Sequence, residues 1–196
     1  MRIQTGIRVE YISSSWMAVE FAGSVVLGLL AGSLALLAFG GDSLVELISG
    51  FAVLRHLRDD VRSPGVHESE RVERFTTALL FSLVPVLGLG EVYSYVSGLR
   101  PEGSPLGIAL AIGAVVIMPY LYIQKQRIGE QTRETPLTID AVESVTCFLM
   151  SIALLGGLLA EFFFGLWWAD YVASAIILAF VAREALESYH DLHGVG

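Results

Sequence analysis

The sequence predicts an all-α integral membrane protein with six transmembrane helices. Of its 196 residues, 54% are hydrophobic and only 16% are charged, whereas about a quarter of the residues in a soluble domain are charged. Long runs without any charged side chain recur at 21–41, 103–123 and 144–160. Each approaches the roughly 20 residues with which a helix crosses a hydrocarbon layer about 30 Å thick. We expect one transmembrane domain over residues 1–196 and no soluble domain.

The six helices follow from these runs in chain order. About 44 residues separate Glu10 from Arg55, and they would form about 66 Å of helix at about 1.5 Å per residue, so the chain crosses twice there. The small residues near Ala31 and Ser33 predict the turn between the two crossings. Pro85 is expected to kink the third helix. The expected ranges are 12–31, 34–57, 72–98, 104–124, 135–160 and 166–188.

The basic residues predict the orientation. Eleven of the twelve lysines and arginines fall at the chain ends or in the second and fourth connections, and only Arg100 lies on the other side. Because basic loops stay in the cytoplasm, we expect both termini to be cytoplasmic. Separately, we expect a multi-pass protein of the inner (plasma) membrane of a bacterium or archaeon. The net charge of −8 gives no indication of nucleic-acid binding. The basic residues on the cytoplasmic side are Arg2, Arg8, Arg55, Arg58, Arg62, Arg71, Arg74, Lys125, Arg127, Arg133 and Arg183.

Six acidic residues fall well inside the predicted helices, and no lysine or arginine is expected at the same depth. A charged side chain near the bilayer centre costs at least about 2.5–3.5 kcal/mol on insertion scales. Each acid must therefore be protonated, solvated in a cavity or paired with a bound cation. A carboxylate that binds a metal gives up its proton, and this linkage is the chemistry of metal/proton exchange. The six acids are Glu20, Asp42, Glu46, Glu91, Asp140 and Glu143.

The spacing of these acids predicts a metal site. Asp42 and Glu46 are one helical turn apart and face the same way. Glu143 and Cys147 belong to a polar stripe on one face of the fifth helix. About 8–12 residues of helix lead to each pair, so both are expected near mid-membrane, where they could form a four-ligand site. The other acids have possible supporting or proton-relay roles: Asp140, Glu20 and Glu91.

Three segments resemble helices of the cation diffusion facilitator family. "SLALLAFGGDSLVELISGFAVLRHLR" resembles the second helix, "LTIDAVESVTCFLMS" the fifth and "WWADYVASAIILAFVAREALES" the sixth. The chain is most similar to short six-helix members without the C-terminal cytoplasmic domain. The resemblance implies a secondary transporter, not an enzyme, that exports divalent metals, typically zinc, in exchange for protons and usually as a homodimer. It implies no cofactor besides the transported metal.

The same resemblance assigns the ligands position by position. Asp42 and Glu46 match the acidic pair of the second helix, with Glu46 one methylene longer than the usual aspartate. Glu143 stands where the family has a histidine, and Cys147 where it has an aspartate. A thiolate among carboxylates suits zinc or cadmium, and manganese and ferrous iron stay open. Magnesium is disfavoured, because it prefers octahedral oxygen ligands.

Three alternatives stay open at the level of sequence: a membrane-embedded metalloenzyme, a non-transporting metal-binding subunit and a proton channel. An enzyme would need an open metal position with a nucleophile or base in reach, and the sequence contains no HExxH signature. Metal binding would argue against a simple proton channel. The absence of a soluble domain from the sequence weighs against a metal sensor but does not distinguish a transporter from a subunit of a larger complex.

Overall fold

Six helices make up the computed structural model, which describes residues 2–60, 69–132 and 135–193. No strand occurs within these ranges, so the predicted all-helical class is confirmed. Arg62 and Arg133, which count toward the predicted orientation, lie outside the described residues. The helices are α1 (Arg2–Ala31), α2 (Leu34–Asp60), α3 (Ser69–Val96), α4 (Pro105–Thr132), α5 (Thr135–Phe164) and α6 (Trp168–His193).

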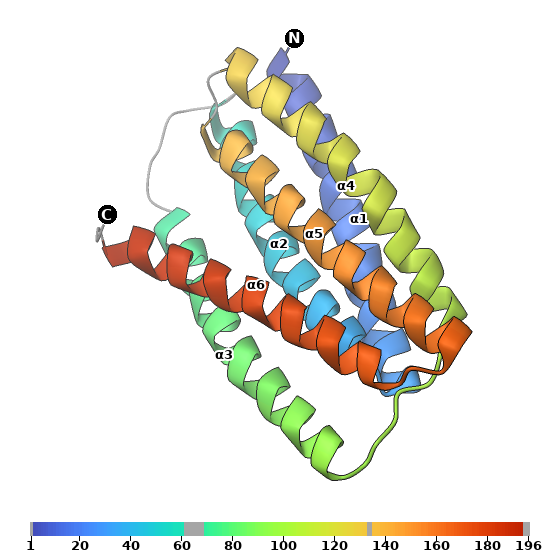
Figure 1. Ribbon diagram of the computed structural model, residues 1–196. Coiled ribbons are helices and arrows are strands. Elements are labelled where there is room, and N and C mark those ends of the chain that lie inside the picture. Colours follow the sequence, from blue (N-terminus) through green and yellow to red (C-terminus); the bar gives the residue numbers. More distant parts are fainter. Residues whose placement is uncertain (1, 61–68, 133–134, 194–196) are drawn as a thin grey trace.

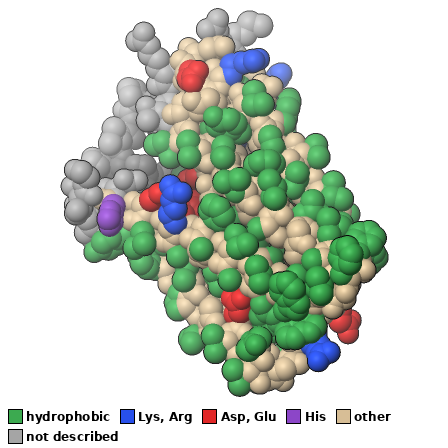
Figure 2. Space-filling view, viewed as in Figure 1, with side chains coloured by type: hydrophobic (Ala, Val, Ile, Leu, Met, Phe, Trp, Pro, Cys, Tyr) green, Lys and Arg blue, Asp and Glu red, His purple; other side chains and the backbone are tan. Residues whose placement is uncertain are grey.

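Five of the six helices, α1 to α5, are long and apolar enough to cross a membrane. The sixth, α6, is interrupted by charged residues at Asp170, Arg183, Glu184 and Glu187. Large apolar side chains lie exposed along the bundle, among them Leu30, Val96 and Phe164. Figure 2 shows such side chains over much of the visible face. An outward apolar surface of this extent is suited to lipid rather than to water, as expected for a multi-pass membrane protein.

Two of the helices extend well beyond the predicted ranges. α1 begins at Arg2 rather than near residue 12, and α4 continues to Thr132 rather than ending near 124. The predictions followed the apolar runs alone, whereas the helices continue through polar residues that find partners inside the bundle. Lys125, predicted to lie in a cytoplasmic connection, is instead in α4 and only 1% exposed.

The arrangement of the helices makes α2 the most central element. It packs against α1, α3, α5 and α6, while α1 also contacts α4, and α4 contacts α5. α3 and α6 pack on each other at the side of this group, and α6 crosses it obliquely (Figure 1). Buried apolar residues, including Phe39, Met118, Met150 and Leu154, fill the space between the helices. Side chains on the inner face of α2 are therefore shielded from the surroundings on several sides.

The predicted turn between the first two helices is confirmed. α1 ends at Ala31, Gly32 adopts a φ of 64°, and α2 begins at Leu34. A positive φ is readily available to glycine because it lacks a Cβ. Asp170 from the first turn of α6 then accepts hydrogen bonds from Ser33 Oγ (2.5 Å) and Leu34 N (3.0 Å). A side chain of α6 thus caps the start of α2, and the two helices begin at the same end of the bundle.

Candidate metal centre

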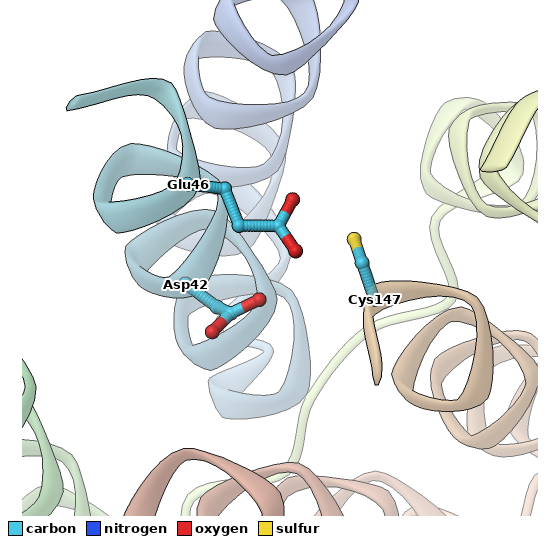
Figure 3. Close-up of side chains that lie close together, drawn as sticks. All are labelled: Asp42, Glu46 and Cys147. Atoms are coloured by element: carbon cyan, nitrogen blue, oxygen red, sulfur yellow. The ribbon is translucent and has the colours of Figure 1, made fainter. Parts of the chain in front are cut away.

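Two carboxyl groups of α2 and the thiol of α5 meet in the interior of the bundle. Asp42 and Cys147 are 0% exposed and Glu46 is 5% exposed. Each offers one ligand atom, and these atoms all lie within 4.8 Å of one another. In Figure 3 the side chains of Asp42 and Glu46 project from α2 toward the region occupied by Cys147. We refer to Asp42, Glu46 and Cys147 as the carboxylate–thiol cluster.

The carboxyl oxygens of this cluster have almost no hydrogen-bond donors. Both Asp42 oxygens and Glu46 Oε2 are buried without a hydrogen-bond partner among the described residues. The hydroxyl of Ser43 does not supply one, because it donates to the carbonyl of Phe39 on its own helix. Burying polar atoms without partners costs free energy, and burying an unpaired charge costs far more. The cluster therefore requires either protons on the carboxyl groups or a cation between them.

Glu143, the fourth predicted ligand, lies outside the group of gathered ligand atoms. Its Oε1 accepts a weak hydrogen bond from Ser49 Oγ at 3.5 Å, and its Oε2 is buried with no hydrogen-bond partner within residues 2–60, 69–132 and 135–193. The reason is the antiparallel run of α2 and α5. Cys147 is level with the turn of α2 that carries Asp42 and Glu46. Glu143 lies one turn earlier on α5 and is therefore level with the next turn of α2. The two predicted pairs are thus staggered by about one helical turn, or about 5.4 Å.

A further acid near the cluster, Glu184 of α6, was missed by the sequence prediction. The residue is half-buried, and its charge acts on Glu46 and Glu143, but it is not among the residues whose ligand atoms gather with that of Asp42. It escaped notice because it follows Arg183 and precedes Glu187 in the charged end of the helix. Glu184 follows Ile177 by seven residues and Val181 by three, and both of these residues are fully buried. This helical spacing is the signal that could have placed Glu184 on the inner face of α6.

A second buried polar group joins α1, α4 and α5. Lys125 Nζ forms an ion pair with Asp140, and its distance to Glu10 Oε2 is 3.6 Å. All three side chains are buried, and Glu10 fits beside Gly50, where an added Cβ would come within 2.7 Å of its Oε1. The prediction that no basic residue lies at the depth of the acids is therefore wrong. Asp140, predicted to support the metal site, is paired with this lysine.

The two remaining predicted acids occupy different surroundings. Glu20 of α1 is fully buried, and neither of its oxygens has a hydrogen-bond partner in the part of the chain that the structure describes. Its charge acts on Asp42, Glu46 and Cys147. Glu91 of α3 is instead half-buried and accepts a hydrogen bond from Ser174 Oγ at 3.4 Å. Glu20 is thus beside the carboxylate–thiol cluster. Glu91 is instead hydrogen-bonded to the N-terminal half of α6, the half that contains Asp170.

A multi-pass helical protein with two buried carboxyl groups and a thiol whose ligand atoms lie within 4.8 Å of one another is suited to handling metal cations within the membrane. The family model described as the cation efflux transmembrane domain matches residues 11–191. The chain therefore belongs to the cation efflux, or cation diffusion facilitator, family, as the resemblance predicted. No curated protein matches it. Members of this family are transporters rather than enzymes, so the chain is an integral membrane transporter of metal cations.

Proposed function

We propose that this transporter exports a divalent metal, zinc foremost, from the cytoplasm in exchange for protons. The observation that carries the proposal is the carboxylate–thiol cluster, whose ligand atoms lie within 4.8 Å of one another and whose carboxyl oxygens largely lack donors among the residues that the structure describes. A divalent cation would satisfy these oxygens together and offset their charge. The transported metal would be held by Asp42, Glu46 and Cys147.

The ligand types favour zinc and cadmium. Zinc accepts carboxylate oxygen and thiolate sulfur in tetrahedral sites, and cadmium shares the preference for a soft sulfur ligand. Manganese and ferrous iron are better matched to oxygen and nitrogen ligands, so a site with a buried thiolate favours them less. We therefore expect zinc or cadmium to be transported best, with manganese and iron as weaker substrates.

Proton coupling follows from the same residues. Carboxyl and thiol groups must lose their protons before they bind a metal, so metal binding releases protons and protonation releases metal. Glu20 and Glu143 flank the cluster and are suited to accept or return these protons. Loading from the cytoplasm and unloading by protonation from the outside would together give efflux driven by the proton gradient.

The moving parts and the assembly are taken from the family resemblance. α1, α2, α4 and α5 would move as a unit against α3 and α6, carrying the cluster between the two sides. The protein would act as a homodimer in the inner membrane of a bacterium or archaeon, with both termini in the cytoplasm. The distribution of basic residues in the sequence supports the orientation.

The proposal is tested by metal uptake into proteoliposomes with an acidic interior. Zinc, cadmium, manganese and ferrous iron are compared for the natural protein, for Asp42→Asn and for Glu130→Gln, which changes an exposed acid of α4. We expect uptake that depends on the pH gradient, that is lost in Asp42→Asn and that persists in Glu130→Gln. Proton flux without metal flux in folded protein would indicate a proton channel and contradict the proposal.

A further inference from the structure

We propose that the buried group of Lys125, Asp140 and Glu10 fastens α4 to α5 and α1 throughout the transport cycle, so that these helices never part to let the metal through. The inference rests on the proposed function and deepens it, because it assigns the residues that make α1, α2, α4 and α5 move as one unit. Lys125 is then a positioning residue of transport that does not bind the metal. We refer to these three residues as the lysine group.

The lysine group joins three helices through one positive charge. Lys125 of α4 forms an ion pair with Asp140 of α5, and its Nζ lies 3.6 Å from Glu10 Oε2 of α1. All three side chains are buried. Neither oxygen of Glu10 has a hydrogen-bond partner within the described ranges, so the ionised acid depends on the nearby ammonium group. Moving α4 away from α1 or α5 would leave buried charges unpaired, which is strongly unfavourable.

The backbone of α2 packs directly against the same group. A Cβ added at Gly50 would lie 2.7 Å from Glu10 Oε1 and 3.2 Å from Ser14 Oγ, and the first of these distances is too short for a side chain. Glycine thus permits the close approach of α2 to the acid of α1. Gly50 follows Glu46 by about one helical turn. The helix that carries two of the proposed metal ligands is therefore held against the lysine group.

A second, apolar layer closes the same four helices toward the end where α1 and α5 begin. A Cβ added at Gly6 of α1 would lie 3.4 Å from Ile128 Cγ2, 3.5 Å from Leu137 Cδ2 and 3.9 Å from Leu57 Cδ1. The three side chains come from α4, α5 and α2, and they belong to a buried core cluster separate from the main one. Along α5, Leu137 precedes Asp140 of the lysine group, which in turn precedes the carboxylate–thiol cluster. A metal passing between these helices would have to cross both layers.

α6 is attached in a different way. Its ion pair, Arg183 with Glu187, joins two exposed residues of the same helix. In the part of the chain that the structure describes, no ion pair links α6 to another helix. α6 also diverges from α5 toward its own C-terminus (Figure 1). Helices can therefore shift at the boundary with α3 and α6 without separating buried ion pairs, as in the rigid-body movements by which many proteins change state.

Reversible cross-links in proteoliposomes test the inference. Ile128→Cys/Leu137→Cys places thiols on α4 and α5 within the apolar layer. Leu34→Cys/Gly90→Cys is the matched pair across the boundary between α2 and α3, where a Cβ at Gly90 would lie 3.9 Å from Leu34 Cδ2. The native Cys147 is buried and is kept in both variants. We expect zinc uptake to continue unchanged when α4 and α5 are linked, and to stop when α2 and α3 are linked until a reductant opens the bond.

The linked fraction is measured by mass spectrometry of the intact protein. Loss of uptake on linking α4 to α5 would show that these helices part during transport and would overturn the inference. Continued uptake with α2 fully linked to α3 would overturn it as well, because the four helices would then not move against α3.

A second variant tests the lysine group itself. Lys125→Met/Asp140→Asn removes one base and one acid from it, and Arg127→Met/Glu130→Gln is the matched control with two exposed residues of α4. We expect natural zinc affinity in Lys125→Met/Asp140→Asn, because no proposed metal ligand changes. Uptake at saturating zinc should fall by at least roughly fivefold, the lower end of usual coupling between parts of a protein. Adding the α4–α5 cross-link should restore uptake, which general unfolding would not allow.

The remaining outcomes distinguish the two levels of the proposal. Uptake by Lys125→Met/Asp140→Asn at the rate of its control, weakened zinc affinity, or no rescue by the cross-link would overturn the role of the lysine group. Failure of the folded natural protein to take up zinc, cadmium, manganese or iron would instead overturn the proposed function on which the inference rests.

Discussion

Replacing Lys125 with methionine should destabilise the protein strongly. Methionine keeps the length of the side chain but removes the charge that Asp140 and Glu10 share. All three residues are nearly inaccessible, with 1% exposure for Lys125 and Glu10 and 4% for Asp140. Breaking a buried ion pair by removing one partner costs about 3–5 kcal/mol, because the other charge stays buried without compensation. We expect a loss in this range, since the two remaining carboxyl groups also repel each other.

The assay is the free energy of unfolding in mixed micelles, titrated with a denaturing detergent. Arg127→Met is the matched control, because Arg127 is an exposed base on the same helix and surface substitutions change stability by less than about 0.5 kcal/mol. The double variant Lys125→Met/Asp140→Asn should be more stable than Lys125→Met alone, since it removes one of the two unpaired acids. Equal stability of Lys125→Met and Arg127→Met would refute the buried ion pair.

Three further predictions concern the cluster and the helix cap. Cys147→Ser should weaken cadmium binding at least roughly tenfold more than manganese binding, because cadmium prefers the softer sulfur ligand. Competition titrations of both metals measure the two losses of affinity. Equal losses would argue against a metal–sulfur bond. Asp42→Asn should leave the metal-free protein at least as stable as before, because it replaces a buried carboxyl group that has no donor among the described residues. Marked destabilisation in the detergent titration would give Asp42 a structural role. Asp170→Ala should lower the free energy of unfolding by about 0.5–2 kcal/mol, the cost of losing a helix cap, since it removes the acceptor for Ser33 Oγ and Leu34 N; an unchanged value would show that the cap does not contribute.

The helices and part of the site could be predicted because their signals are local. Apolar runs of about 20 residues indicate a membrane helix whatever surrounds them, and Ala31–Ser33 marks the first turn by composition alone. Asp42 and Glu46 share a face because they are four residues apart on one helix. That Cys147 lies beside them was also reachable, since counting residues from the start of α5 gives its approximate depth.

The rest depends on how different helices pack against one another. Glu143 is separated from the cluster by the register of α2 against α5. The shapes of the packed side chains contribute to this register, and the spacing of residues within one helix does not determine it. Lys125 and Glu184 have a related cause. Both lie among charged residues near the end of a helix, where exposure is the ordinary state of a charge. The burial of Lys125 depends on the carboxyl groups that α1 and α5 contribute.

The most direct test of the metal centre is X-ray absorption at the zinc edge of the zinc-loaded protein, compared with Cys147→Ser. The account predicts one sulfur neighbour at about 2.3 Å, the usual zinc–thiolate distance, together with oxygen neighbours from the carboxyl groups. In Cys147→Ser the sulfur contribution should vanish while the oxygen contribution persists. A zinc ion surrounded only by oxygen or nitrogen in the natural protein would contradict the claim that the carboxylate–thiol cluster binds the transported metal.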